Sequence, residues 1–114
     1  TFFSSTNFRD VIFSKCLINN VKLRGTSFKD SIIENFSILN SDLNRSIYEY
    51  CTFKDIIFEK CKMFMFMCFK TNLSGVHFNN SNLTLSKFIS CDKKNTVFSD
   101  NNKMLCILEK DSKR

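Results

Sequence analysis

A five-residue period runs through the sequence and constrains its fold more than any other feature. Divided into fives from Thr1, the chain carries a large apolar residue at the third position of almost every group up to Phe98, and a small or β-branched residue at the first. The exceptions are Cys68 and Lys93 at the third position and Phe36, Ile56 and Phe66 at the first. An α-helix repeats about every 3.6 residues and a strand about every 2.0, so neither can bury both positions. The chain must therefore turn a corner in every group of five.

The second position of the period supports a specific resemblance. It holds Asp or Asn in several groups, namely Asn7, Asp42, Asn72 and Asn82. A small residue, Asp or Asn, a large apolar residue and two variable residues form a pattern that resembles the pentapeptide-repeat family, and the match covers about residues 1–100 in unbroken register. The resemblance implies an all-β fold, a right-handed quadrilateral parallel β-helix of about five coils, in which four repeats form one square coil.

Twenty residues per coil predicts which core side chains stack on one another. Two columns should be rich in aromatic rings: Phe8, Phe28, Tyr48, Cys68 and Phe88 form one, and Ile18, Ile38, Phe58, Phe78 and Phe98 form the other. The remaining columns are Phe13, Ile33, Phe53, Leu73 and Lys93, and Phe3, Leu23, Leu43, Met63 and Leu83. Because each coil would contact only its neighbours, stability should be a nearest-neighbour property.

The repeat divides the chain into two parts. Residues 1–100 are predicted to form the β-helix, and residues 101–114 a C-terminal cap or tail, with a short amphipathic helix as one form of it. Lys93 in the core column indicates that the regular coil is ending there. The chain opens on Thr1 rather than Met, so we expect a fragment or a processed product, with further coils or another chain covering its first coil.

The cysteines fit the repeat and predict no metal site. Cys16, Cys51, Cys61, Cys91 and Cys106 share the phase of the small column, and Cys68 lies in the large one. No Cys-x-x-Cys pair occurs, which argues against zinc. Structural, reduced thiols favour a reducing compartment such as the cytoplasm or an organelle interior. Glycosylation sequons favour a secretory, oxidising compartment instead, although an Asn- and Ser-rich repeat generates them by chance. They begin at Asn35, Asn44, Asn72, Asn79 and Asn82.

Catalytic chemistry finds no support in the sequence. His77, the single histidine, falls at an outward second position. Acidic residues such as Asp10, Asp30 and Asp55 occupy the fifth position, where corners meet solvent, and no facing carboxylate pair can be argued. No glycine-rich phosphate loop occurs. We therefore expect no enzyme, no cofactor, no metal and no small-molecule substrate.

The run Cys61–Lys70, "CKMFMFMCFK", supplies the candidate interaction surface. The register places Cys61, Met63, Phe66 and Cys68 inward, so the other apolar residues of the run should point outward beside apolar residues of neighbouring coils. The predicted surface consists of Ile47, Tyr50, Phe64, Met65, Met67, Phe69, Leu85 and Ile89. Apolar patches of this kind mark interaction surfaces. Three alternatives stay open: a bulge that turns Phe66 or Phe69 inward in place of Cys68, cover by the C-terminal tail, or a relaxed surface without function. A smaller patch is predicted at Ile12 and Ile32.

Charge and family resemblance leave several functional classes. The net charge is +6 and suits an acidic partner, but much of the excess lies near the C-terminus, without a dense basic stripe. No apolar run approaches the length of about 20 residues that a membrane-spanning helix needs. Some pentapeptide-repeat proteins mimic DNA with an acidic face and protect topoisomerases, whereas this chain is basic. The sequence predicts a non-enzymatic scaffold or protein-interaction module, which self-associates, binds a protein partner or forms a subunit of a larger assembly. A nucleic-acid-associated or topoisomerase-protecting protein is the alternative.

Overall fold

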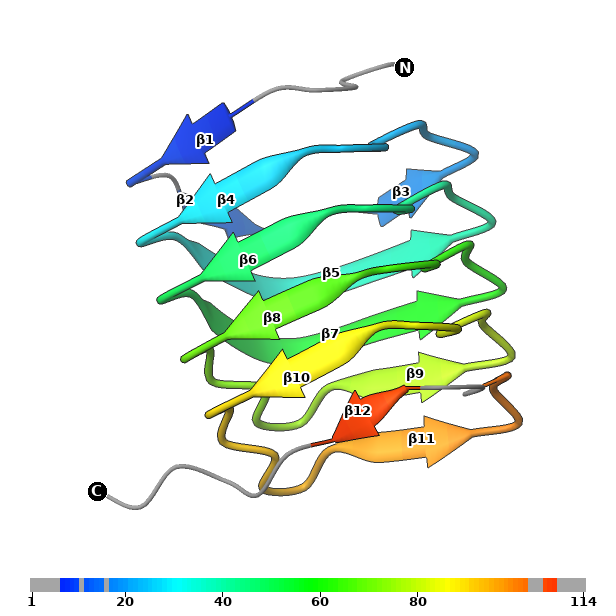
Figure 1. Cartoon of the computed structure of the whole chain (residues 1–114). Coiled ribbons are helices and arrows are strands. Elements are labelled where there is room, and N and C mark those ends of the chain that lie inside the picture. The colour runs from blue at the N-terminus through cyan, green and yellow to red at the C-terminus, as the bar shows by residue number, and fades with distance from the viewer. Residues whose placement is uncertain (1–6, 11, 16, 103–105, 109–114) are drawn as a thin grey trace.

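The protein winds as a β-solenoid whose walls are built from short parallel strands (Figure 1). The computed structural model describes residues 7–10, 12–15, 17–102 and 106–108. One sheet contains β1 (Asn7–Arg9), β4 (Ser27–Lys29), β6 (Ile47–Glu49), β8 (Met67–Phe69), β10 (Lys87–Ile89) and β12 (Ile107–Leu108). The other contains β2 (Ile12–Ser14), β3 (Leu17–Asn19), β5 (Ile32–Leu39), β7 (Thr52–Glu59), β9 (His77–Asn79) and β11 (Val97–Ser99). Among the described residues there is no helix, and so none that could cross a membrane.

Every strand pair of the two sheets joins residues twenty positions apart. Phe28 lies opposite Tyr48 between β4 and β6, and Phe58 lies opposite Phe78 between β7 and β9. A further wall carries isolated parallel bridges at the same offset, which run from Lys22 through Asp42, Lys62 and Asn82 to Asn102. Four five-residue repeats therefore complete one coil, and the predicted right-handed quadrilateral β-helix is confirmed.

The corners of the coil lie at the fifth position of the repeat. Every described residue with a positive φ occupies this position, with φ between 48° and 70°. Asn and Asp fill many of these corners, because they tolerate the left-handed region better than other residues with a side chain. At Gly75 a Cβ atom would lie 2.9 Å from Oδ1 of Asp55, so a side chain at this corner would have to displace that carboxylate. The left-handed corner is the local reason for the five-residue period.

The second position stabilises the corner when it is Asp or Asn. Oδ1 of Asn72 accepts a hydrogen bond from the backbone N–H of Ser74 at 2.9 Å, and Oδ1 of Asp42 accepts one from Asn44 at 3.0 Å. These are Asx turns, in which a short side chain replaces a backbone acceptor. The Asp and Asn residues on which the family resemblance depends therefore have a structural role.

The large column forms the core as predicted, with aromatic rings stacked from coil to coil. Phe28 stacks on Tyr48 with ring centroids 4.9 Å apart, and Phe58 stacks on Phe78 at 5.0 Å. Phe78 continues the second column onto Phe98 at 5.0 Å. The spacing matches the distance of about 4.8 Å between neighbouring strands, so backbone pairing and ring stacking reinforce each other.

The small column contributes hydrogen bonds as well as space. Oγ1 of Thr71 donates to the carbonyl oxygens of Phe69 at 3.0 Å and of Tyr48 at 3.2 Å. The thiol of Cys51, one coil earlier, donates to the equivalent carbonyls of Glu49 at 3.3 Å and Phe28 at 3.5 Å. Cysteine, serine and threonine therefore perform one task at the first position: they fit inside the corner and satisfy carbonyl groups that face the core.

The C-terminal segment continues the solenoid where it is described. Asn102 bridges to Asn82, and β12 pairs with β10 through Ile107 and Lys87. A strand therefore occupies residues 107–108, for which a helical cap was one prediction. The boundary at residue 100 and the form of the cap stay predictions, because residues 103–105 and 109–114 lie outside the described part of the chain.

Candidate interaction surface

The run Cys61–Lys70 follows the register that its sequence predicts. Cys61, Met63, Phe66 and Cys68 are buried, whereas Phe69 is half-buried on the outer side of β8. The described chain thus keeps Cys68 inward and contains no bulge that exchanges it for Phe69. Phe66 is inward as well, so both side chains of this irregular pair face the core.

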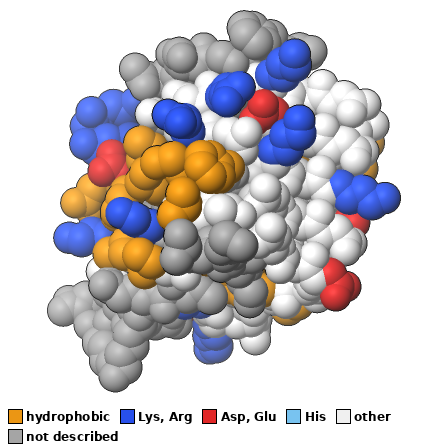
Figure 2. Space-filling view, turned by 45° about the vertical axis from the view of Figure 1, so that its right-hand side comes forward, with side chains coloured by type: hydrophobic (Ala, Val, Ile, Leu, Met, Phe, Trp, Pro, Cys, Tyr) orange, Lys and Arg blue, Asp and Glu red, His pale blue; other side chains and the backbone are white. Residues whose placement is uncertain are grey.

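The eight residues predicted as an interaction surface lie on adjacent strands and corners, and we call them the candidate surface. Met67 is paired with Ile47 of β6, and Phe69 is paired with Ile89 of β10. Tyr50 is 52% exposed. The others are half-buried: Ile47, Phe64, Met65, Met67, Phe69, Leu85 and Ile89. Figure 2 shows hydrophobic side chains gathered over this side of the solenoid and its adjoining corner.

Three residues of the candidate surface occupy left-handed corners. Tyr50, Met65 and Leu85 have φ values of 54°, 57° and 60°. The left-handed conformation costs a residue with a Cβ about 1–2 kcal/mol, and only Gly, Asn and Asp adopt it routinely. Lys and Arg also occupy corners, but their charged ends are solvated there. For a bulky apolar residue at an outward corner, both the left-handed backbone conformation and the exposure of the side chain to water are unfavourable.

Positive charge borders the candidate surface. Arg45, Lys70 and Lys87 are exposed, and Lys87 lies between Met67 and Ile107 across the sheet. Nζ of Lys70 lies 5.8 Å from the centre of the Tyr50 ring, within the range of a cation–π contact. Figure 2 shows Lys and Arg side chains around the hydrophobic patch.

Acidic residues lie on this face and at its corner: Glu49 on a strand, and Asp30 at the corner one coil before Tyr50, where it pairs with Arg9 at 3.7 Å. Glu49 of β6 is half-buried between Lys29 of β4 and Phe69 of β8. The carboxylate therefore has a basic residue beside it on the preceding coil. The balance of charge around the candidate surface is positive.

A second apolar area lies on the sheet that contains β5 and β7. Ile12 is paired with Ile32 as predicted, and these side chains are 70% and 39% exposed. The predicted patch did not include Leu17, which is 68% exposed on β3. Its outward second position in the repeat was the signal that could have identified it.

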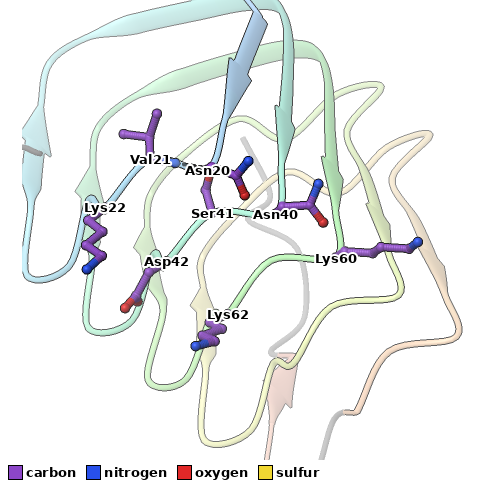
Figure 3. A pocket seen from close by; sticks show the side chains of 8 residues that line it. All are labelled: Asn20, Val21, Lys22, Asn40, Ser41, Asp42, Lys60 and Lys62. Carbon is purple, nitrogen blue, oxygen red and sulfur yellow. Dashed lines mark hydrogen bonds between the residues drawn. The ribbon is translucent and has the colours of Figure 1, made fainter. Parts of the chain in front are cut away.

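A polar groove of about 310 Å³ follows another corner of the solenoid. Figure 3 shows Lys22, Asp42 and Lys62 on successive coils along one side of it, with Asn40 and Lys60 across the corner. The backbone of Asp42 forms parallel β-bridges with the backbones of Lys22 and Lys62, so positive and negative side chains alternate along this wall. The lysines could attract a small anion, but the carboxylate between two of them opposes this.

The buried thiols are poorly suited to reactions. Burial is the main reason that the pKa of Cys61 rises to about 11. Burial also raises the pKa values of Cys51 and Cys68 above the ordinary value of a thiol. A nucleophilic or metal-binding cysteine needs a lowered pKa. Among the described residues, no group of three or more His, Cys, Asp or Glu side chains gathers as a metal-ion site would require.

No protein-family model and no curated protein matches the sequence. Among solved structures, the pentapeptide-repeat protein Rfr23 from the cyanobacterium Cyanothece 51142 is similar, with a TM-score of 0.55, 13% identity, and coverage of 95% of this chain and 91% of that chain. QnrB1, a plasmid-mediated fluoroquinolone resistance protein, gives a TM-score of 0.45 at 14% identity and covers 87% of this chain and 65% of its own. The likeness to Rfr23 is one of fold. Together with the five-residue period and the four-sided coils, it shows that this chain has the fold of a pentapeptide-repeat β-helix.

Proposed function

We propose that this chain is a non-enzymatic scaffold that binds a protein through the candidate surface, either alone or as a subunit of a larger assembly. The observation that carries the proposal is the placement of Tyr50, Met65 and Leu85 at left-handed corners that border one apolar face. A requirement of the backbone alone would favour Asn, Asp or Gly at these corners. In this proposal, the three apolar corner residues contact a protein partner.

The composition of the candidate surface suits protein recognition. Aromatic residues and methionine are enriched in protein interfaces, and the unbranched methionine side chain adapts to the shape of a partner. The candidate surface contains Met65, Met67, Tyr50, Phe64 and Phe69. These side chains belong to strands and corners held in register by backbone hydrogen bonds, so that binding would order little additional backbone.

Site-specific photo-crosslinking tests this proposal. A photoreactive amino acid at position 67, in the centre of the candidate surface, should capture a discrete protein in extracts of the source cells. The matched control carries the same amino acid at position 57, because Ile57 is also an outward residue of a paired strand and is 40% exposed on another wall. Equal capture patterns at both positions would show that the candidate surface has no special role.

Nucleic-acid association, the alternative prediction, gives a different result. Binding of duplex DNA should weaken steeply as salt rises, because phosphate contacts release counterions. It should also persist in a Met67→Ser, Phe69→Ser variant, since this variant keeps every charge of the chain. Salt-dependent DNA binding that the variant retains would favour this alternative over the scaffold. Rescue of a topoisomerase from an inhibitor would favour a protective role.

A further inference from the structure

We propose that the partner of the candidate surface is a protein segment in which acidic side chains surround apolar anchors. This inference rests on the proposed function and adds the chemistry of the partner to it. The candidate surface supplies an apolar centre, and Arg45, Lys70 and Lys87 supply exposed positive charge at its border. Complementary charge at the rim of an interface increases the association rate and selects among partners.

The three basic residues lie close enough to the apolar side chains to act on one ligand. The backbone N–H of Arg45 donates to the carbonyl of Phe64 at 2.8 Å, which places the Arg45 corner directly beside Phe64. The backbone N–H of Lys70 donates to the carbonyl of Ile89 at 3.0 Å at the opposite end of the strands. Lys87 is the strand neighbour of Met67. Positive charge thus borders the apolar centre at both corners and interrupts it on β10.

The same charges disfavour a second copy of the chain as the occupant. Two candidate surfaces placed face to face would bring like charges together, and like charges across an interface are destabilising. Glu49 is half-buried beside Lys29, and Asp30 at the corner one coil before Tyr50 is paired with Arg9, so both carboxylates already have a basic neighbour in their own chain. The net charge of +6 adds a long-range repulsion between copies.

The shape of the candidate surface favours a protein over a membrane. Peripheral proteins insert apolar side chains about 5–10 Å into the boundary of the bilayer. Seven of the eight side chains here are half-buried, and Tyr50 is the exposed one. Such a surface can be covered by a complementary side-chain layer but presents little that could insert into lipid.

Peptide selection tests the inference because it requires no assumption about which protein the partner is. A random peptide library displayed on yeast is sorted for binding to the full chain and counter-sorted against the Met67→Ser, Phe69→Ser variant. The selected peptides should be enriched in Asp and Glu next to Leu, Phe or Tyr. A selected peptide should lose about tenfold in affinity when its acidic residues become Asn and Gln, and this difference should shrink in high salt. A Lys70→Glu, Lys87→Glu variant should bind it more weakly than the wild type.

Each other outcome overturns the inference, and most leave the proposed function intact. Selected peptides that are neutral or basic would mean that the surface binds protein through apolar contact alone. A wild-type dimer that the Met67→Ser, Phe69→Ser variant fails to form would identify a second copy as the occupant. Co-sedimentation with vesicles that contain phosphatidylserine, lost in the same variant, would identify a membrane. If no peptide distinguishes the wild type from the variant, the inference fails, and photo-crosslinking at position 67 decides separately whether the surface binds any protein.

Discussion

The ring of Phe66 lies in the core 5.1 Å from the ring of Tyr48 and 6.0 Å from the ring of Phe88, centroid to centroid, and these are the residues on either side of Cys68 in its column. Cys68 follows Tyr48 in a column of large residues, and Phe66 stands in a column that is otherwise small at Ser46 and Ser86. Both side chains are completely buried. The two exceptions to the repeat therefore compensate for each other: the phenylalanine fills space that a large residue at position 68 would otherwise occupy.

This exchange predicts a strong coupling between positions 66 and 68. Phe66→Ser alone should lower the free energy of unfolding by about 3–5 kcal/mol, because it leaves a cavity. Cys68→Phe alone should lower it by about 1–3 kcal/mol through overpacking. The double variant restores the regular pattern and should recover most of both losses in urea unfolding. Strictly additive losses would show that the two side chains do not share space.

Phe53 and Phe69 should respond differently to truncation. Phe53 is 1% exposed and lies 5.0 Å from the Tyr48 ring, so Phe53→Ala should cost about 3–5 kcal/mol. Phe69 lies on the outer side of β8, and Phe69→Ser should change the free energy of unfolding by less than about 1 kcal/mol. Urea unfolding of the two variants makes the comparison, and equal losses would place Phe69 in the core.

Stability should fall at alkaline pH partly through Cys61. Burial raises the pKa of this thiol to about 11 from its ordinary value of 9.0, so the folded chain holds the proton more tightly than the unfolded chain. The protonated Cys61 thiol therefore contributes about 2–3 kcal/mol to the free energy of unfolding. This contribution is complete below pH 9 and is lost as the pH rises toward 11.

Cys61→Ser is the control for this prediction. A serine hydroxyl can donate to the same carbonyl oxygens, those of Ile38 and Glu59, but does not titrate in this range. The free energy of unfolding of the wild type should decline more steeply than that of Cys61→Ser between pH 9 and pH 11. Lysines titrate in both proteins and cancel in the difference. Parallel pH curves would mean that the Cys61 thiol is not protected in the fold.

Opposite substitutions at two corners should have opposite effects on stability. Gly75→Ala should lower the free energy of unfolding by at least about 1 kcal/mol, since the added Cβ meets Asp55 and φ is 70°. Met65→Asn should raise it by about 0.5–1 kcal/mol, because Asn accepts the left-handed conformation.

Met65→Asn also tests function against stability. The same variant should weaken capture of a partner by the candidate surface while it unfolds at a higher urea concentration. A stabilised variant with undiminished binding would show that Met65 is tolerated at its corner without a role in contact.

The sequence by itself determined the coil. Its five-residue period predicted the inward columns, and the resemblance to the pentapeptide-repeat family implied the twenty-residue offset between strand partners and hence the stacking of Phe58 on Phe78, all of which the structure shows. Such prediction succeeds because each coil contacts only its neighbours, and position in the repeat therefore fixes both burial and partner. The outward direction of Met67 and Phe69 followed from the same register.

Only the tertiary structure decided how exceptions to the period are accommodated. The sequence marked Phe66 and Cys68 as two separate irregularities, and their compensation depends on side chains that meet across the core. The left-handed corners at Tyr50, Met65 and Leu85 likewise required backbone angles that no periodicity supplies. How far neighbouring outward side chains cover one another depends on their packing across three coils. A one-dimensional pattern specifies which residues face one another, whereas volume, strain and exposure arise from their arrangement in space.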